Sequence, residues 1–308
     1  MSFAFFFPGQ GSQSLNMMNG FDGQTVIKAT FDEASAVLGQ DLWAMINGEH
    51  AETINETVNT QPLMLAAGIA TYRAYLEAGG KEPSVMAGHS LGEYTALVVA
   101  GSLSFVDALK LVRLRAELMQ SAVPQGTGSM AAILGLDDDA VRAVCAEAAQ
   151  GEVVEAVNFN SPGQVVIAGS IAAVERAIET AKAKGAKRAL PLPVSVPSHC
   201  SLMKPAAEKL AEALKAVDIQ PPKIPVIHNA DVASYNNAEQ IKDALVRQLY
   251  SPVRWTETVN ALVAQGIIQS AECGPGKVLA GLAKRINKEA SCSALTNTEQ
   301  VSAFIAAH

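Results

Sequence analysis

The sequence predicts an α/β protein in which a mostly parallel sheet forms the main body and a small ferredoxin-like subdomain is inserted into it. Short apolar strands alternate with helices over residues 1–124 and again over residues 196–308, as in a parallel sheet covered by helices. Between these parts, residues 125–195 follow the βαββαβ order of a ferredoxin-like unit. Because that unit lies inside the chain, we expect it to be an insertion into the larger core.

The composition fits a protein with a large buried core. Of the 308 residues, 49% are hydrophobic and 17% are charged, and the formal net charge of −7 disfavours a nucleic-acid partner. The four cysteines form no C-x-x-C pair and no metal-ligand spacing, which favours reduced thiols and no bound metal. The apolar run at 3–7 is too short to span a membrane, and no basic segment precedes it. We therefore expect a cytoplasmic protein without a membrane anchor.

The first part of the chain begins with a buried strand at residues 2–7, which ends at Pro8. The glycine-rich loop at 8–13 lacks the third glycine and the Lys-Ser/Thr pair of phosphate-binding loops. Its glycines are instead expected to let backbone N–H groups point into a site. Hydrophobic patterning then predicts a strand at 85–87 and helices at 25–38, 61–79 and 105–123.

The inserted unit and the rest of the core show the same kind of patterning. Within the insert we expect strands at 130–134, 153–158, 164–168 and 187–192, and helices at 138–149 and 171–184. Three prolines between 191 and 197 return the chain to the main body. There we expect strands at 224–228 and 267–272, and helices at 202–217, 238–249, 255–266 and 277–286.

The stretch 84–101 carries the clearest chemical signal. It contains a short strand, the turn GHSLG at 88–92, and a helix. A G-x-S-x-G turn between a strand and a helix is typical of a nucleophile elbow, where glycines permit a sharp turn with the serine at its tip. Free N–H groups at the start of the helix favour developing negative charge. We therefore predict that Ser90 is a nucleophile; the alternative is a chance glycine pair in a loop.

A serine needs a base to act as a nucleophile near neutral pH, and the sequence has five histidines. His199 follows the rigid Val-Pro-Ser segment at the junction of the two predicted subdomains, where clefts form. His89 adjoins Ser90 and is expected to point away from it and support the turn. The other three lie in a polar turn, after an apolar strand and at the C-terminus: His50, His228 and His308. We predict that His199 is the base.

Two questions stay open at this point. No Asp or Glu lies near His199 in the sequence, so either a distant carboxylate or a backbone carbonyl could orient its ring. Arg113 and Arg115 lie two residues apart on one predicted helix and point in well-separated directions. At most one of them should face any given pocket.

Several short motifs follow one another in a specific order over essentially the whole chain. They are FPGQGSQ at 7–13, GHSLGE at 88–93, RAELMQ at 115–120, PSH at 197–199, QLYSPVRW at 248–255 and GPG at 274–276. In these motifs and their order, the chain resembles the malonyl-CoA:acyl-carrier-protein transacylases, and among them the discrete bacterial enzymes.

The resemblance implies a hydrolase-like α/β core with a ferredoxin-like insert. It implies that Ser90 carries a malonyl group, that His199 is its base, and that the backbone N–H groups of Gln10 and Leu91 form the oxyanion hole. Arg115 would bind the malonyl carboxylate.

The resemblance further implies that the carbonyl of Gln248 orients the histidine. The partners of the protein would be malonyl-CoA, free coenzyme A and an acyl carrier protein, whose phosphopantetheine thiol accepts the malonyl group for fatty acid biosynthesis. No metal and no cofactor would be required, and we expect a monomer.

Two other classes of protein compete with this interpretation. A serine esterase or thioesterase of the α/β-hydrolase type shares the elbow, but its histidine lies late in the chain and its acid precedes it. Here a long segment follows His199, and no H-G-G-G loop is present. A non-catalytic interaction module is disfavoured because Ser90 and His199 are both intact.

Overall fold

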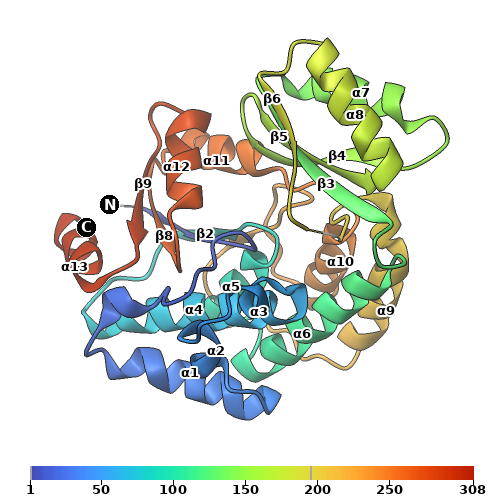
Figure 1. The fold of residues 1–308 in the computed structure, drawn as a ribbon. Helices are drawn as coiled ribbons and strands as arrows, with labels where there is room; N and C mark the ends of the chain where they lie inside the picture. Colours follow the sequence, from blue (N-terminus) through green and yellow to red (C-terminus); the bar gives the residue numbers. More distant parts are fainter. Residues whose placement is uncertain (1, 195) are drawn as a thin grey trace.

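The computed structural model describes residues 2–194 and 196–308. Figure 1 shows two parts, a larger one built around a parallel sheet and a smaller one, drawn in green and yellow, above it. Met1 and Ser195, the last residue of the predicted insert, lie outside the described residues. Within the described part of the chain, no helix has both the length and the apolar character needed to cross a bilayer.

The larger part contains a five-stranded parallel sheet of order β7-β2-β1-β8-β9. Its central strands are apolar and fully buried, as strands covered by helices on both faces must be. The strands are β1 (Ala4–Phe7), β2 (Val85–Gly88), β7 (Val226–Ile227), β8 (Gln269–Cys273) and β9 (Ser291–Leu295). The predicted mostly parallel α/β core is confirmed.

Successive side chains of β1 face opposite layers of helices. Phe5 and Phe7 pack in the main core with helices of the first half of the chain. Phe6 packs on the other face with Trp255 and the helices near the C-terminus. The helices are α1 (Thr25–Leu38), α2 (Leu42–Ile46), α3 (Ala51–Asn55), α4 (Thr57–Glu77), α5 (Gly92–Val99), α6 (Phe105–Ser121), α9 (Lys204–Leu214), α10 (Ala238–Gln248), α11 (Trp255–Ala264), α12 (Val278–Ile286) and α13 (Thr298–Ala307), with the 3-10 turns η1 (Asn19–Phe21) and η2 (Ser201–Met203).

The smaller part is a four-stranded antiparallel sheet of order β4-β5-β3-β6 with two helices on one face. Its chain order, β3-α7-β4-β5-α8-β6, is the predicted βαββαβ order of a ferredoxin-like unit. The elements are β3 (Gly128–Leu134), α7 (Asp138–Ala149), β4 (Val154–Ser161), β5 (Gln164–Ser170), α8 (Ile171–Ala183) and β6 (Arg188–Pro191). All of them fall within the predicted insert, whose boundaries at 124/125 and 195/196 stay a prediction.

The two parts are joined by backbone hydrogen bonds as well as by the chain connections. Phe159 N–H donates to the Val253 carbonyl at 3.0 Å, and Val253 N–H donates to the Val157 carbonyl at 2.8 Å. The open face of the small sheet contributes Met130 and Val157 to a buried cluster with Cys200 of the main part. These contacts fix the insert over the elbow side of the core.

The observed elements differ from the predicted ones mainly at their ends. The predicted strand at 224–228 is reduced to the two residues of β7, because Pro225 has no N–H to donate to a ladder. The predicted helix at 202–217 is divided into η2 and α9, since Pro205 suits the first turn of a helix. Helix α4 begins at Thr57, so Pro62 lies inside it. Five short or half-exposed elements were not predicted: η1, α2, α3, β9 and α13.

Candidate functional site

The predicted elbow is formed by the end of β2 and the start of α5. Ser90 at its tip has φ 52°, in the left-handed region that a side chain disfavours. Both glycines are required by close backbone contacts. A β-carbon on Gly88 would lie 1.8 Å from the Gly92 carbonyl carbon, and one on Gly92 would lie 2.0 Å from the Phe7 carbonyl oxygen. The predicted strand, turn and helix are therefore present, and only glycine fits the two outer positions.

The residues predicted as nucleophile and base are in hydrogen-bond contact. Ser90 Oγ lies 2.7 Å from His199 Nε2. His199 Nδ1 lies 2.8 Å from the Gln248 carbonyl oxygen, so Nδ1 carries a proton and Nε2 is free to accept the serine hydroxyl. The ring is only 2% exposed. Burial, reinforced by the positive charge of Arg115, lowers the pKa of His199 to about 3, which keeps the imidazole neutral and its Nε2 lone pair free near neutral pH.

The carbonyl that holds His199 comes from the end of a helix. Gln248 is the last residue of α10, where the final carbonyls have no partner within the helix. One of these carbonyls accepts the His199 Nδ1 proton. Of the two alternatives left by the sequence, the structure places a backbone carbonyl, and not a carboxylate, against the ring.

Arg115 projects from α6 into the same site, and its side chain is 1% exposed. Its Nη2 donates to Ser90 Oγ at 3.2 Å and to Gln248 Oε1 at 2.9 Å, and its Nη1 donates to Gln61 Oε1 at 2.8 Å. No carboxylate within the described ranges forms an ion pair with it. Arg113 instead donates to Gln40, so of the two arginines only Arg115 reaches the serine.

A cavity of about 130 Å³ opens between the core and the insert beside these side chains. Gln10 and Leu91, the predicted oxyanion-hole residues, line it with Ser90, Arg115 and His199. Its apolar wall combines residues of both parts of the chain: Leu91, Met119, Met130, Leu192, Val194 and Val196. All the sequence-predicted site residues therefore border one cavity or, like Gln248, contact its lining. The cavity also lies at the predicted junction.

The arrangement can activate a serine and bind an anion beside it. Comparison with known proteins agrees with this chemistry. Residues 4–297 match the acyl transferase domain family. The malonyl CoA-acyl carrier protein transacylase of Escherichia coli K12 is 56% identical over 304 residues, which cover 98% of each chain. The chain belongs to the malonyl CoA-acyl carrier protein transacylase family.

Solved structures of the transacylase family agree in fold. The acyl-carrier-protein S-malonyltransferase of Burkholderia pseudomallei superposes with a TM-score of 0.98 at 57% identity, covering 99% of this chain and all (100%) of that one. A malonyl-transacylase solved in complex with a type II polyketide synthase acyl-carrier protein gives a TM-score of 0.98 at 54% identity, with 100% of both chains covered. The resemblance and the two-part fold predicted from the motifs are both confirmed.

Sequence reasoning missed three polar residues of this transacylase site: Gln61, Glu93 and Asn229. Gln61 accepts from Arg115, and the other two lie behind Ser90. Two weak signals were available. Glu93 follows Ser90 by one helical turn, and Asn229 follows the carboxyl end of β7, the edge at which parallel sheets place their sites.

The remaining histidines serve other contacts. His89 Nε2 lies 2.8 Å from Asn160 Oδ1 of the insert, and its ring packs against Trp255, so it points away from Ser90 as predicted. His228 Nδ1 lies 2.7 Å from Glu93 Oε1 in the core. Among residues 2–194 and 196–308, no group of three or more His, Cys, Asp or Glu side chains is placed to hold a metal ion.

Proposed function

We propose that this protein transfers the malonyl group of malonyl-CoA to the phosphopantetheine thiol of an acyl carrier protein, for fatty acid biosynthesis. The reaction proceeds through a malonyl ester of Ser90. The observation that carries the proposal is the 2.7 Å contact of Ser90 Oγ with His199 Nε2, with the buried Arg115 guanidinium 3.2 Å from the same oxygen. The site thus combines an activated nucleophile with a fixed positive charge.

In the first step, Ser90 Oγ attacks the carbonyl carbon of the malonyl thioester while His199 Nε2 accepts the hydroxyl proton. The negative charge that develops on the carbonyl oxygen is stabilised by the backbone N–H groups of Leu91 and Gln10. The carbon–sulfur bond then breaks, and the coenzyme A sulfur leaves with the proton from His199. The product is a malonyl ester of Ser90.

In the second step, the carrier-protein thiol enters the position that coenzyme A has left. His199 takes its proton, and the thiolate attacks the ester carbonyl. The bond to Ser90 Oγ breaks, and the serine recovers the proton from His199. The Gln248 carbonyl, held at 2.8 Å from Nδ1, keeps the ring oriented throughout.

Arg115 separates this function from that of a serine esterase or thioesterase. A neutral ester gives a buried guanidinium no partner, whereas the malonyl carboxylate can form a bidentate pair with it. We propose that Arg115 binds that carboxylate and thereby selects the acyl group.

Further parts of the proposal concern the whole protein. Neither step calls for a metal or a cofactor, because the proton and the acyl group move between Ser90, His199 and the two thiols. We propose a monomeric cytoplasmic enzyme whose core, residues 1–124 and 196–308, carries the reacting groups. The subdomain at 125–195 closes one side of the cavity.

Intact-protein mass spectrometry tests the function directly. After mixing with malonyl-CoA, the wild-type protein should gain one malonyl group, and carrier protein with its phosphopantetheine should remove it. Ser90→Ala should gain none. Acylation of the alanine variant would contradict the assignment of the nucleophile. Release of free malonate in place of transfer to the carrier would favour the thioesterase.

A further inference from the structure

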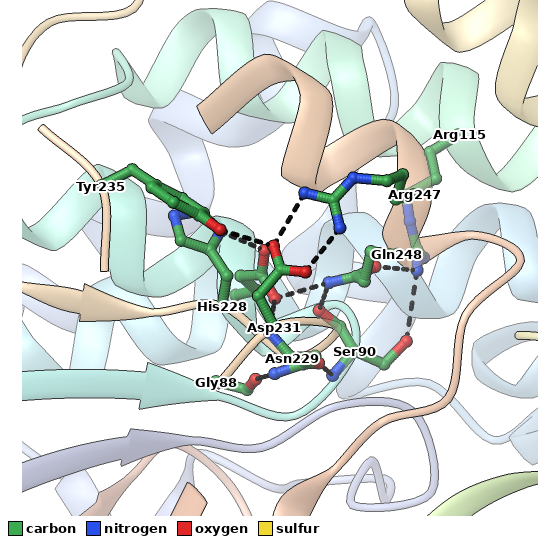
Figure 2. Close-up of polar contacts among 10 residues, drawn as sticks. Gly88, Ser90, Arg115, His228, Asn229, Asp231, Tyr235, Arg247 and Gln248 are labelled. Carbon is green, nitrogen blue, oxygen red and sulfur yellow. Dashed lines mark hydrogen bonds and ion pairs between the residues drawn. The ribbon is translucent and has the colours of Figure 1, made fainter. Parts of the chain in front are cut away.

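The strained turn at Ser90 is held from behind by two side-chain amides (Figure 2). The Ser90 N–H donates to Asn229 Oδ1 at 2.7 Å, and Asn229 Nδ2 donates to the Gly88 carbonyl at 2.7 Å. Gln248 Nε2 donates to the Ser90 carbonyl at 3.0 Å. Since φ at Ser90 is 52°, the turn persists only where its surroundings hold it. The Asn229 side chain therefore joins Gly88 to Ser90 across the turn.

A buried carboxylate fixes both amides. Glu93 lies three residues after Ser90 on α5 and is 0% exposed. Its Oε2 accepts the Asn229 N–H at 2.8 Å and Gln248 Nε2 at 3.0 Å, and its Oε1 lies 2.7 Å from His228 Nδ1. A buried charge is tolerated only with such partners. The carboxylate therefore ties the segment of Asn229 and the end of α10 to the helix that follows the nucleophile.

We propose that Asn229 and Glu93 are positioning residues for acyl transfer: the Glu93 carboxylate holds the Asn229 backbone and the Gln248 amide, and the Asn229 amide holds Ser90 in its left-handed conformation. Neither residue is in the proposed machinery of bond making. This inference rests on the proposed function for its main readout, but it concerns how the elbow is held and not which acyl group it carries.

The contacts predict an effect on rate and not on substrate binding. The direction of Ser90 Oγ depends on the backbone dihedrals of the turn, and its 2.7 Å contact with His199 tolerates little displacement. A misplacement of about 1 Å at reacting atoms lowers rates by about 10²-fold. Neither Asn229 nor Glu93 lines the substrate cavity, so the KM for malonyl-CoA should change little.

The test compares four substitutions in the full chain. Asn229→Ala removes both contacts to the elbow, and Asn229→Asp keeps the volume and the acceptor for Ser90 N–H but loses the donor to Gly88. Glu93→Ala removes the anchor. Glu93→Gln keeps an acceptor oxygen for Asn229 and Gln248. Its amide nitrogen can face His228 Nδ1 when that ring carries its proton on Nε2, which has no other partner within the described residues.

A matched control lies on the outer side of the same segment. Tyr235 donates from its hydroxyl to Asp231 Oδ2 at 2.9 Å, and Asp231 pairs with Arg247 (Figure 2). Tyr235→Phe removes one hydrogen bond from this segment without touching the elbow. Its kcat should stay within about twofold of wild type, since the contacts of Asn229, Glu93 and Gln248 that hold the turn are all kept.

The constants kcat and KM are measured in the steady state, and kcat is divided by the fraction of protein that becomes malonylated, so that unfolded protein does not count. We expect kcat to fall about 10²-fold in Asn229→Ala and Glu93→Ala, with the KM for malonyl-CoA within about twofold. The kcat of Glu93→Gln should be at least about tenfold higher than that of Glu93→Ala, because the hydrogen bonds of residue 93, and not its charge, position the elbow. The kcat of Asn229→Asp should fall by about tenfold, and this variant tests the proposal if Asn229→Ala does not fold.

Wild-type kcat in a folded Asn229→Ala or Asn229→Asp variant would overturn the proposal, as would a Glu93→Gln variant as slow as Glu93→Ala. A rate loss that vanishes after correction for the active fraction would do the same. Labelling of Ser90 by a fluorophosphonate distinguishes failure of the positioning proposal from failure of the proposed function, because the labelling reaction requires only the nucleophile and its base. If wild-type protein labels but transfers no malonyl group, the function is wrong, and the labelling rates of the same variants still decide the positioning role.

Discussion

Replacement of Arg115 by alanine should change which acyl group the protein prefers. The guanidinium is 1% exposed and contacts only neutral acceptors, on Gln61, Ser90 and Gln248. Burial lowers the pKa of Arg115, yet arginine stays charged at any working pH. The protein therefore keeps a desolvated cation beside Ser90 that forms no ion pair among the described residues, and in the proposed reaction the malonyl carboxylate would pair with it.

The size of the effect follows from the bonds exchanged. A hydrogen bond to a charged group contributes about 1.5–3 kcal/mol, and a bidentate pair makes two of them. Giving up a contact to Ser90 or Gln248 and desolvating the carboxylate take back part of this gain. A net preference of roughly 3 kcal/mol for malonyl over acetyl remains, which is about 10²-fold at about 1.4 kcal/mol per factor of ten.

The assay is the ratio of kcat/KM for malonyl-CoA to that for acetyl-CoA. Arg115→Ala should lower this ratio by about 10²-fold through loss of malonyl transfer, while acetyl transfer is kept or increased. Arg115→Lys should restore only part of it, because an ammonium cannot form the planar fork. Arg113→Ala is the matched control, since Arg113 lies on the same helix and donates to Gln40. An unchanged ratio in Arg115→Ala, or a changed one in Arg113→Ala, would refute the reasoning.

Further predictions concern His199, the docking of the carrier protein and Gly92. The pKa of His199 is lowered from 6.5 to about 3, so as pH falls the unfolded chain binds this proton before the folded protein does. The free energy of unfolding should therefore decrease as pH drops from about 6.5 toward 3. In urea denaturation of His199→Ala, the free energy of unfolding should depend less on pH over this range. His199→Ala should also lose several orders of magnitude in kcat, and the wild-type rate should show no loss from this group at pH 6–7, which a pH–rate profile checks. Added salt should raise the KM for carrier protein more than that for malonyl-CoA if an acidic carrier docks near Lys187 and Arg285, which line one surface groove; equal salt effects on both constants would exclude this steering. Gly92→Ala should destabilise the fold by about 3 kcal/mol or more in urea denaturation, whereas Gly281→Ala, with nothing within 4 Å of its added carbon, should not.

The parts that the sequence predicted are those encoded by neighbouring residues. The elbow requires glycine on both sides of Ser90, and its strand and helix have different hydrophobic periods, so the motif and its context agree. The insert was visible because four strands and two helices follow one another in a familiar order. His199 could be chosen among five histidines because prolines mark the junction where it lies.

The parts that the sequence did not predict depend on tertiary packing. Strand β9 buries little of its own surface and forms only because β8 offers it a parallel edge. Gln61 lies on a helix buried on most faces, where one amide among apolar residues gave no sign of Arg115 across the site. Asn229 comes together with Ser90 across 139 positions of sequence. Periodicity reports which face of an element is buried and carries no information about such pairs.

The absence of a carboxylate behind His199 has a physical reason in this site. The backbone carbonyl of Gln248 orients the ring, and its side-chain Oε1 accepts a hydrogen bond from Arg115 Nη2 at 2.9 Å. A carboxylate placed here to orient His199 would share the buried site with that guanidinium, whose charge already acts on the His199 ring, and would attract it. Arg115 would then have little to gain from a malonyl carboxylate, and the imidazolium and the guanidinium would compete for one anion. A backbone carbonyl orients the ring without charge, and it leaves the cation of Arg115 available to the substrate.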